Sequence, residues 1–179
     1  PRSRGELPLQ YLTGSQTPED FLSDIAAQAQ DYAGFNLLVG GHDSLWHYTN
    51  SDTQGPQNLP PGIYGLSNAT LDTPWPKVVL GKAKLLALLE TGPVSHRALA
   101  DVVSSQQLAD QNSLIAQGLD STMESTLSPQ FIVTDTYGTR SSTTLWFDAQ
   151  AQASWLELSF NTQGVLREVQ HKEMRLSDR

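Results

Sequence analysis

Apolar side chains recur at helical spacing in the first part of the chain. A helix is predicted to begin at Thr17, because Pro18 then takes the first helical position and Asp20 follows three residues after the cap. Gly34 is predicted to end this helix. Its apolar positions fall on one side of a helix with 3.6 residues per turn, so they form one buried face. That face consists of Phe21, Leu22, Ile25, Ala29 and Tyr32.

Three further segments have a helical pattern or length. A second helix is predicted after Trp75, and Gly92-Pro93 ends it. Ser95 is a suitable cap for a third helix over about residues 95–104, and residues 105–118 form a weaker candidate for a fourth. The polar segment 119–129 is predicted to be a loop.

Short apolar or alternating runs predict strands before and after these helices. Residues 35–39 and 45–48 flank a glycine-containing turn and predict a hairpin. Residues 62–67 predict a short strand, which follows the Gly- and Pro-rich loop 50–61. The end of the chain predicts an antiparallel meander with a hairpin turn at 161–164. Its strands are 142–148, 154–161 and 165–172, after a strand-like run at 131–133.

This order of elements predicts an α+β fold, because the helices and the C-terminal strands are grouped along the chain. We expect a single domain over residues 1–179, in which about the first 16 residues form an irregular lead-in containing Gly5, Pro8 and Gly14. Because the sequence begins with Pro1 and not with Met, we expect Pro1 to be an internal residue of a longer gene product.

Composition excludes several classes of partner. The net charge is −8, and no dense Lys/Arg cluster occurs, so we expect no nucleic-acid partner. No apolar run reaches the roughly 18 residues that a membrane-spanning helix needs. The basic start of the chain is not followed by the apolar segment of a secretory signal, and we expect a cytoplasmic protein.

The sequence contains no cysteine, which excludes a disulfide, a thiolate metal site and a cysteine nucleophile within these residues. The histidines are His42, His47, His96 and His171. His42 and His47 are five residues apart, so on one strand they would point to opposite faces, which argues against a shared metal. We expect neither a metal nor a cofactor.

Three segments, read in order, resemble the NRDE family, which is also called the transport and Golgi organisation 2 family. The first is Arg4-Gly5-Glu6-Leu7 with the later Gly34-Phe35-Asn36-Leu37. The second, and most specific, is Tyr64-Gly65-Leu66-Ser67-Asn68-Ala69 followed by Thr73-Pro74-Trp75. The third is Tyr137-Gly138-Thr139-Arg140. The resemblance covers nearly all of residues 4–175.

The resemblance implies an N-terminal-nucleophile-hydrolase-like αββα sandwich, related to penicillin V acylase and bile salt hydrolase and incomplete here at the N-terminus. In that group an N-terminal cysteine is the nucleophile and its own α-amine is the base, which a reference pKa near 8 allows. The family begins with Met-Cys and carries an Asn-Arg-Asp-Glu signature, and neither is present in this sequence. We therefore expect this chain alone to be catalytically inactive and the missing N-terminal segment to be its partner.

Four residues are candidates for the site. By resemblance, Asn68 matches an asparagine that binds an oxyanion or a substrate carbonyl, and Arg140 matches an arginine near the nucleophile. Without the resemblance, Asn68 would be a turn residue and Arg140 a surface residue. Tyr64 and Trp75 are candidates for lining a substrate pocket, although core packing is the commoner role of such residues.

Two functions follow from the resemblance. The first is a cysteine N-terminal-nucleophile hydrolase that acts on an amide or acyl bond. The alternative is a binding or trafficking module without turnover, which holds haem or an acyl lipid and is linked to Golgi organisation and secretion in animal relatives.

Overall fold

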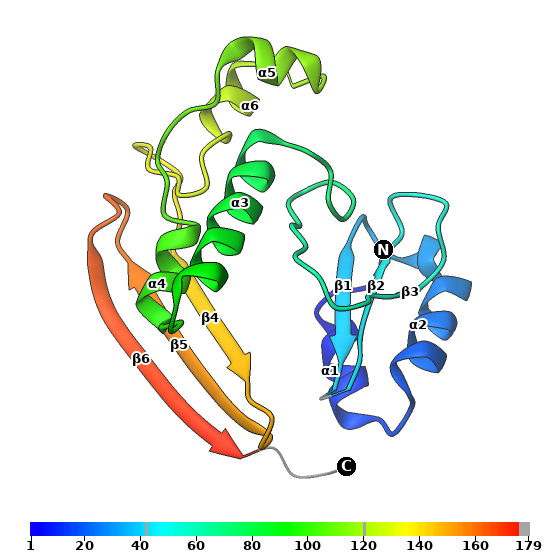
Figure 1. The fold of residues 1–179 in the computed structure, drawn as a ribbon. Helices are drawn as coiled ribbons and strands as arrows, with labels where there is room; N and C mark the ends of the chain where they lie inside the picture. The colour runs from blue at the N-terminus through cyan, green and yellow to red at the C-terminus, as the bar shows by residue number, and fades with distance from the viewer. Residues whose placement is uncertain (42, 120, 176–179) are drawn as a thin grey trace. The chain divides into compact units, whose positions relative to one another are not determined.

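The computed structural model describes residues 1–41, 43–119 and 121–175. The chain divides into two compact units, Pro1–Thr73 and Pro74–Arg179, and each consists of helices packed on a small antiparallel sheet (Figure 1). The α+β prediction is therefore confirmed. The single-domain expectation stays a prediction.

The first unit begins with a helix, so the prediction of an irregular lead-in over about residues 1–16 was wrong. Helix α1 spans Glu6–Thr13 and has Gly5 at its N-cap and Gly14 at its C-cap. Pro8 is tolerated because the backbone N–H groups of a first helical turn have no partner within the helix. The three supposed breakers thus lie at the ends of the helix or in its first turn.

Helix α2 spans Pro18–Ala27, and the short 3₁₀ helix η1 follows at Ala29–Asp31. The predicted cap is present, because the Thr17 side chain accepts a hydrogen bond from the Asp20 backbone N–H at 3.1 Å. Both helices pack on one face of the sheet. The buried core of this unit consists of Leu7, Phe21, Leu22, Ile25, Ala29, Tyr32, Phe35, Val39 and Tyr48.

The sheet of the first unit has the strand order β1-β2-β3, with β1 at Asn36–Gly40, β2 at Leu45–Thr49 and β3 at Gln57–Asn58. The predicted hairpin is confirmed, since β1 and β2 are antiparallel and Leu37 pairs with Tyr48. Leu37 and Tyr48 belong to the face that packs on the helices. Asn36, Leu38 and His47 project from the opposite face.

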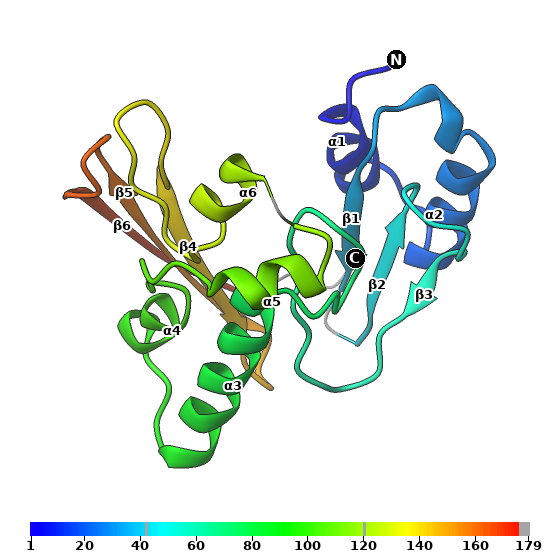
Figure 2. The same cartoon turned by 90° about the horizontal axis from the view of Figure 1, so that it is seen from above.

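The second unit starts with two helices, α3 at Pro76–Thr91 and α4 at His96–Val102. Figure 2 shows both on one side of the sheet β4-β5-β6. Helix α5, Gln111–Ala116, lies within the predicted weak helix. Helix α6, Thr122–Thr126, occupies the segment predicted to be a loop, so that prediction was wrong.

The predicted C-terminal meander is confirmed. Its strands are β4 at Ser141–Phe147, β5 at Gln152–Phe160 and β6 at Leu166–Arg175, and both pairings are antiparallel. Residues 131–133 form only an isolated bridge, between Val133 and Gly138, and not a strand. One face of this sheet meets α4. The other face carries the partly exposed side chains of Leu145, Phe147 and Met174.

Candidate functional site

The segment with the most specific resemblance is a closed loop and not the strand predicted at 62–67. The Gly65 N–H donates to Asp72 Oδ1 at 2.7 Å, and the Asp72 N–H donates back to the Gly65 carbonyl oxygen at 2.8 Å. Asp72 has a φ of 59°, in the left-handed region that aspartate tolerates better than most residues. These two bonds close the loop at its ends and hold residues 66–71 between them.

Asn36 connects this loop to the sheet. Its Nδ2 donates to the Ala69 carbonyl oxygen at 2.9 Å, and its Oδ1 lies 3.0 Å from His47 Nε2. His47 is buried, and burial lowers its pKa from the ordinary value, so the neutral imidazole is favoured. A neutral ring that carries its proton on Nε2 donates to the Asn36 amide oxygen. The chain of contacts therefore runs from the sheet to the residue after Asn68.

Beside this chain of contacts lies a small polar cleft of about 70 Å³. A volume of this size holds a few water molecules or one small polar group. It is too small for a drug-sized ligand, so it is not a substrate pocket by itself. The cleft is lined by His47, Thr49, Asp52, Gln54, Gly55, Gln57, Thr70 and Leu71.

The structure places Asn68 and Tyr64 in the first unit. The Asn68 side chain is exposed and projects from the closed loop, next to the Ala69 carbonyl that Asn36 holds. Tyr64 is half-buried, and its hydroxyl donates to the Pro60 carbonyl oxygen at 2.7 Å. Tyr64 therefore connects two points of the segment that precedes the closed loop, while the Asn68 carboxamide is exposed to solvent.

Trp75 and Arg140 belong to the second unit. Trp75 is the N-cap residue of α3, and Lys77 Nζ lies 5.7 Å from the centroid of its ring. Burial lowers the pKa of Lys77, whose ammonium donates to the Leu127 carbonyl oxygen at 2.8 Å. Arg140 immediately precedes β4, as predicted, and its side chain is exposed. The four predicted site residues are thus divided, two to each unit.

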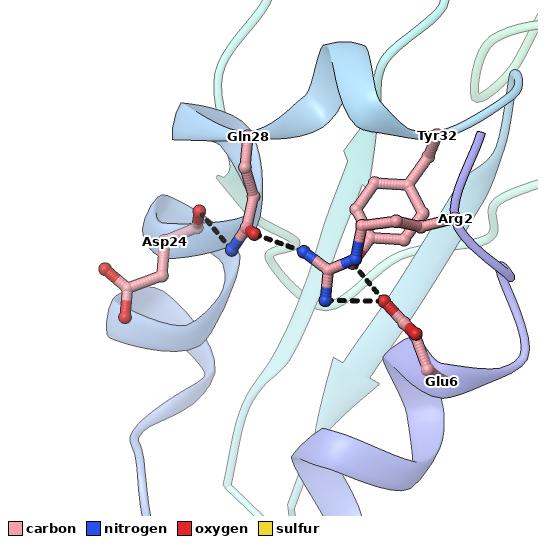
Figure 3. Close-up of polar contacts among 5 residues, drawn as sticks. All are labelled: Arg2, Glu6, Asp24, Gln28 and Tyr32. Atoms are coloured by element: carbon pink, nitrogen blue, oxygen red, sulfur yellow. Dashed lines mark hydrogen bonds and ion pairs between the residues drawn. The ribbon is translucent and has the colours of Figure 1, made fainter.

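Glu6 of the first resembling segment belongs to a polar cluster at the start of the chain (Figure 3). Arg2 Nη2 lies 2.6 Å from Glu6 Oε1, which also accepts a hydrogen bond from the Tyr32 hydroxyl at 2.7 Å. The Arg2 guanidinium also donates to Gln28 Oε1 at 2.6 Å and lies 5.0 Å from the centroid of the Tyr32 ring. These contacts fasten the start of the chain to η1 and to the end of α2.

Sequence reasoning missed a second polar cluster, which lies between α4 and the sheet of the second unit. His96 is buried at the first position of α4, with Nδ1 2.6 Å from Thr144 Oγ1 and Nε2 2.8 Å from Ser154 Oγ. Ser154 Oγ is also 3.2 Å from His171 Nε2, and this nitrogen lies 3.9 Å from Glu173 Oε1. Burial, and then the neighbouring His171, lower the pKa of His96.

No short motif announces this cluster, because its members are far apart in the sequence. The available signal was that successive side chains of a strand point to opposite faces of the sheet. In β4, β5 and β6 this places Thr144, Ser154 and His171 on the same face. His42, the fourth histidine, lies outside the described residues. Within the described part of the chain, no group of three or more His, Asp or Glu side chains is arranged to hold a metal ion, and no helix is long and apolar enough to cross a membrane.

Comparison with known proteins agrees with the resemblance. The profile of the family described as Transport and Golgi organisation 2 matches residues 1–162. The chain is 33% identical over 174 residues to the Transport and Golgi organization protein 2 homolog of Bos taurus, an alignment that covers 88% of this chain and 62% of the relative. It is 29% identical over 187 residues to the homolog of Homo sapiens, in an alignment that covers 97% of this chain and 66% of the relative.

The chain thus spans slightly less than two thirds of the length of these relatives. The profile match extends over all three resembling segments, including the closed loop with Asn68 and the residues around Arg140. The predicted resemblance is confirmed, since NRDE and transport and Golgi organisation 2 are names for the same family. The chain belongs to the Transport and Golgi organisation 2 family.

Proposed function

We propose that this chain is part of a cysteine N-terminal-nucleophile hydrolase that cleaves an amide or acyl bond. The 179 residues contain no cysteine, so the nucleophile belongs to sequence outside them. On this proposal the segment with the nucleophile is the partner of this chain, and Asn68 and Arg140 provide polar contacts to the reacting group. The substrate is a small-molecule amide or acyl compound in the cytoplasm.

The main support is the way the closed loop presents Asn68. The Gly65–Asp72 bonds and the Asn36 bond to Ala69 fix the backbone on both sides of this residue, while its carboxamide stays exposed. A donor held in place before the reaction stabilises a developing oxyanion without the cost of reorganisation. The Asn36 amide oxygen in turn lies 3.0 Å from Nε2 of the buried His47.

The layers of each unit support the αββα architecture that the proposal requires. In the first unit the helices cover one sheet face, and Leu38 and Leu45 are partly exposed on the other. In the second unit α4 covers one sheet face, and Leu145 and Phe147 are half exposed on the other. Each unit thus has helices on one face of a β-sheet, and this helix-on-sheet layering is the one that an αββα sandwich contains twice.

The test uses the full-length gene product, because the nucleophile lies outside this chain. Thiol-dependent hydrolysis of a panel of N-acyl amides and acyl thioesters is measured before and after alkylation with iodoacetamide. We expect Asn68→Ala to lower kcat by about 10²–10³-fold if it donates to the oxyanion. Asn58→Ala is the matched control, because Asn58 is an exposed asparagine of the same unit.

Hydrolysis that alkylation abolishes, together with a selective loss in Asn68→Ala, supports the proposal. Turnover that is absent, or that survives alkylation unchanged, overturns it. Equal activity of Asn68→Ala and Asn58→Ala would show that Asn68 is not part of the site, without contradicting the proposed class of reaction. Unfolding curves of both variants distinguish lost chemistry from lost structure.

One observation favours the alternative, a binding or trafficking module without turnover. The open sheet face of the second unit contains an apolar cleft of about 390 Å³, within the size range of ligand sites. Among the described residues that line it, Lys172 is the only charged one, so the cleft combines an apolar surface with an ammonium group. An acyl chain with a carboxylate, or haem with its propionates, has the matching chemistry. The lining residues are Leu145, Phe147, Ala153, Trp155, Lys172 and Met174.

Titration of the full-length protein with a fatty acid and with haemin tests this alternative. Quenching of the Trp155 fluorescence reports occupancy of the cleft, with Trp155→Phe as the control for the signal. Leu145→Asp should abolish binding, because it places a carboxylate in the apolar cleft. Binding that persists after cysteine alkylation favours the module, whereas binding that Leu145→Asp leaves unchanged excludes this cleft.

A further inference from the structure

The hydroxyl of Ser154 lies between two imidazoles, and one tautomer of His96 satisfies every hydrogen bond around it. The Thr144 hydroxyl donates to the Leu156 carbonyl oxygen at 3.5 Å, so its oxygen is free to accept from His96 Nδ1 at 2.6 Å. His96 Nε2 then carries no proton and accepts from the Ser154 hydroxyl at 2.8 Å. The Ser154 oxygen in turn accepts from His171 Nε2 at 3.2 Å.

This arrangement has the parts of an activated nucleophile. A hydroxyl donates to an unprotonated imidazole nitrogen, and a third group holds the imidazole in the required tautomer. The Trp146 ring stacks on the His96 ring with the centroids 3.7 Å apart, which fixes the plane of the base. A donor on the serine oxygen, here His171, favours the loss of the hydroxyl proton.

We propose that Ser154 is a nucleophile with His96 as its general base, and that it takes an acyl group from an activated acyl ester or thioester. In this step a bond forms between Ser154 Oγ and the carbonyl carbon, and the hydroxyl proton moves to His96 Nε2. The bond to the leaving group then breaks, and the departing alkoxide or thiolate takes the proton from His96. The product is Ser154 with an ester-linked acyl group, and His96 is again neutral.

The accessibility of the cluster fits this role. Ser154 is half-buried on β5, and His171, whose Nε2 lies 3.2 Å from the serine oxygen, is exposed on the edge strand β6. The His96 side chain, from the first residue of α4, is buried against the sheet, where burial lowers its pKa and keeps it neutral. The titratable groups that act on the pKa of His96 are Glu173, which raises it, and His171, which lowers it. The base is thus available at neutral pH.

The test is covalent labelling of the full-length protein with a fluorophosphonate after its cysteines have been blocked with N-ethylmaleimide. The Ser154 oxygen displaces fluoride from phosphorus and its proton passes to His96, so the adduct reports the same nucleophile and base. Peptide mapping locates the adduct. Ser154→Ala should remove it, and Ser142→Ala, a serine on the adjacent strand, is the matched control.

His96→Gln should lower the labelling rate by about 10²–10⁴-fold, the usual contribution of a general base. In the unaltered protein the rate should fall as pH is lowered through a midpoint below the ordinary imidazole pKa of about 6.5. That profile requires no variant and stays informative if His96→Gln fails to fold. No adduct at Ser154, or a labelling rate independent of pH, overturns the proposal and leaves the cluster as an anchor for α4. Because the cysteine is blocked, the amide-hydrolase proposal is not tested by this experiment and neither result depends on it.

Discussion

Asn36 and His47 lie diagonally across the β1–β2 hairpin, with 3.0 Å between Asn36 Oδ1 and His47 Nε2. The same carboxamide donates through Nδ2 to the Ala69 carbonyl oxygen, so one side chain joins the sheet, a buried imidazole and the loop that presents Asn68. The Asn36 amide nitrogen therefore holds the loop, and the amide oxygen is held by His47.

Asn36→Ala should destabilise the first unit and loosen the closed loop. It leaves the buried His47 without its partner and removes the bond to Ala69, and an unsatisfied buried polar group costs about 1–3 kcal/mol. Urea unfolding should show a decrease of this size in the free energy of unfolding. Amide hydrogen exchange should become faster over residues 65–73.

The control for this prediction is Asn68→Ala. Because the Asn68 side chain is exposed, its removal should change the free energy of unfolding by less than about 0.5 kcal/mol. If the two variants unfold alike, Asn36 does not support the loop as the contacts indicate.

Stability should depend on pH through two buried histidines. Burial lowers the pKa of His47 and of His96 in the folded chain, so the unfolded chain binds protons more readily just below the ordinary value of about 6.5. By linkage, this contribution to stability is complete above about pH 6.5 and is lost as pH falls toward the lowered values. The urea midpoint should therefore decrease on acidification from about pH 7.5 to 5.5.

His47→Gln isolates the contribution of the first unit, because glutamine keeps a polar side chain but does not titrate in this range. The decrease of the midpoint on acidification should be smaller in this variant, and smaller again when His96→Gln is added. An unchanged pH dependence in the double variant would show that other groups cause it.

The sequence predicted those elements whose signals are local. The cap at Thr17 and the hairpin over residues 35–48 rest on neighbouring residues, and both are confirmed. Helix α6 also had a local signal, since Ser121 and Glu124 form a capping box, but its polar composition favoured a loop. The segment 62–67 was predicted to be a short strand, yet the Gly65–Asp72 bonds make its second half part of a closed loop.

The candidate sites depend on contacts that local patterns do not contain. The resemblance identified Asn68, but not that Asn36, more than thirty positions earlier, holds the loop on which it lies. The cluster of His96, Ser154 and His171 depends on the register of three strands and on the docking of α4 against them. Register is set by cross-strand packing and by turn geometry, so a single strand does not reveal its neighbours.

The cap of α2 gives a prediction with a conservative control. Thr17→Ala removes the oxygen that accepts from the Asp20 N–H and should lower the free energy of unfolding by about 1 kcal/mol. Thr17→Ser keeps that oxygen and should stay close to the original protein. Helix α2 contributes Phe21, Leu22 and Ile25 to the core, so the loss should appear in global unfolding. Equal stability of the two variants would mean that this cap contributes nothing.

Gly164 and Gly118 share a backbone conformation but differ in their surroundings. Their φ angles are 72° and 69°, so alanine at either position takes on left-handed strain of about 1–2 kcal/mol. A Cβ at Gly118 meets no atom within 4 Å, whereas one at Gly164 would lie 2.8 Å from Val133 Cγ2. Gly164→Ala should therefore be the more destabilising change. The additional loss should be about 1–3 kcal/mol, the usual cost of an overpacked contact.

Urea unfolding of both alanine variants measures this difference directly. Adding Val133→Ala to Gly164→Ala removes the methyl group that the new Cβ would strike, and it should recover part of the lost stability. The same change in the Gly118→Ala background should recover none, because the two sites share no contact. Equal losses for the two glycine variants, without recovery, would mean that strain alone governs the β5–β6 turn and that Val133 moves aside at little cost.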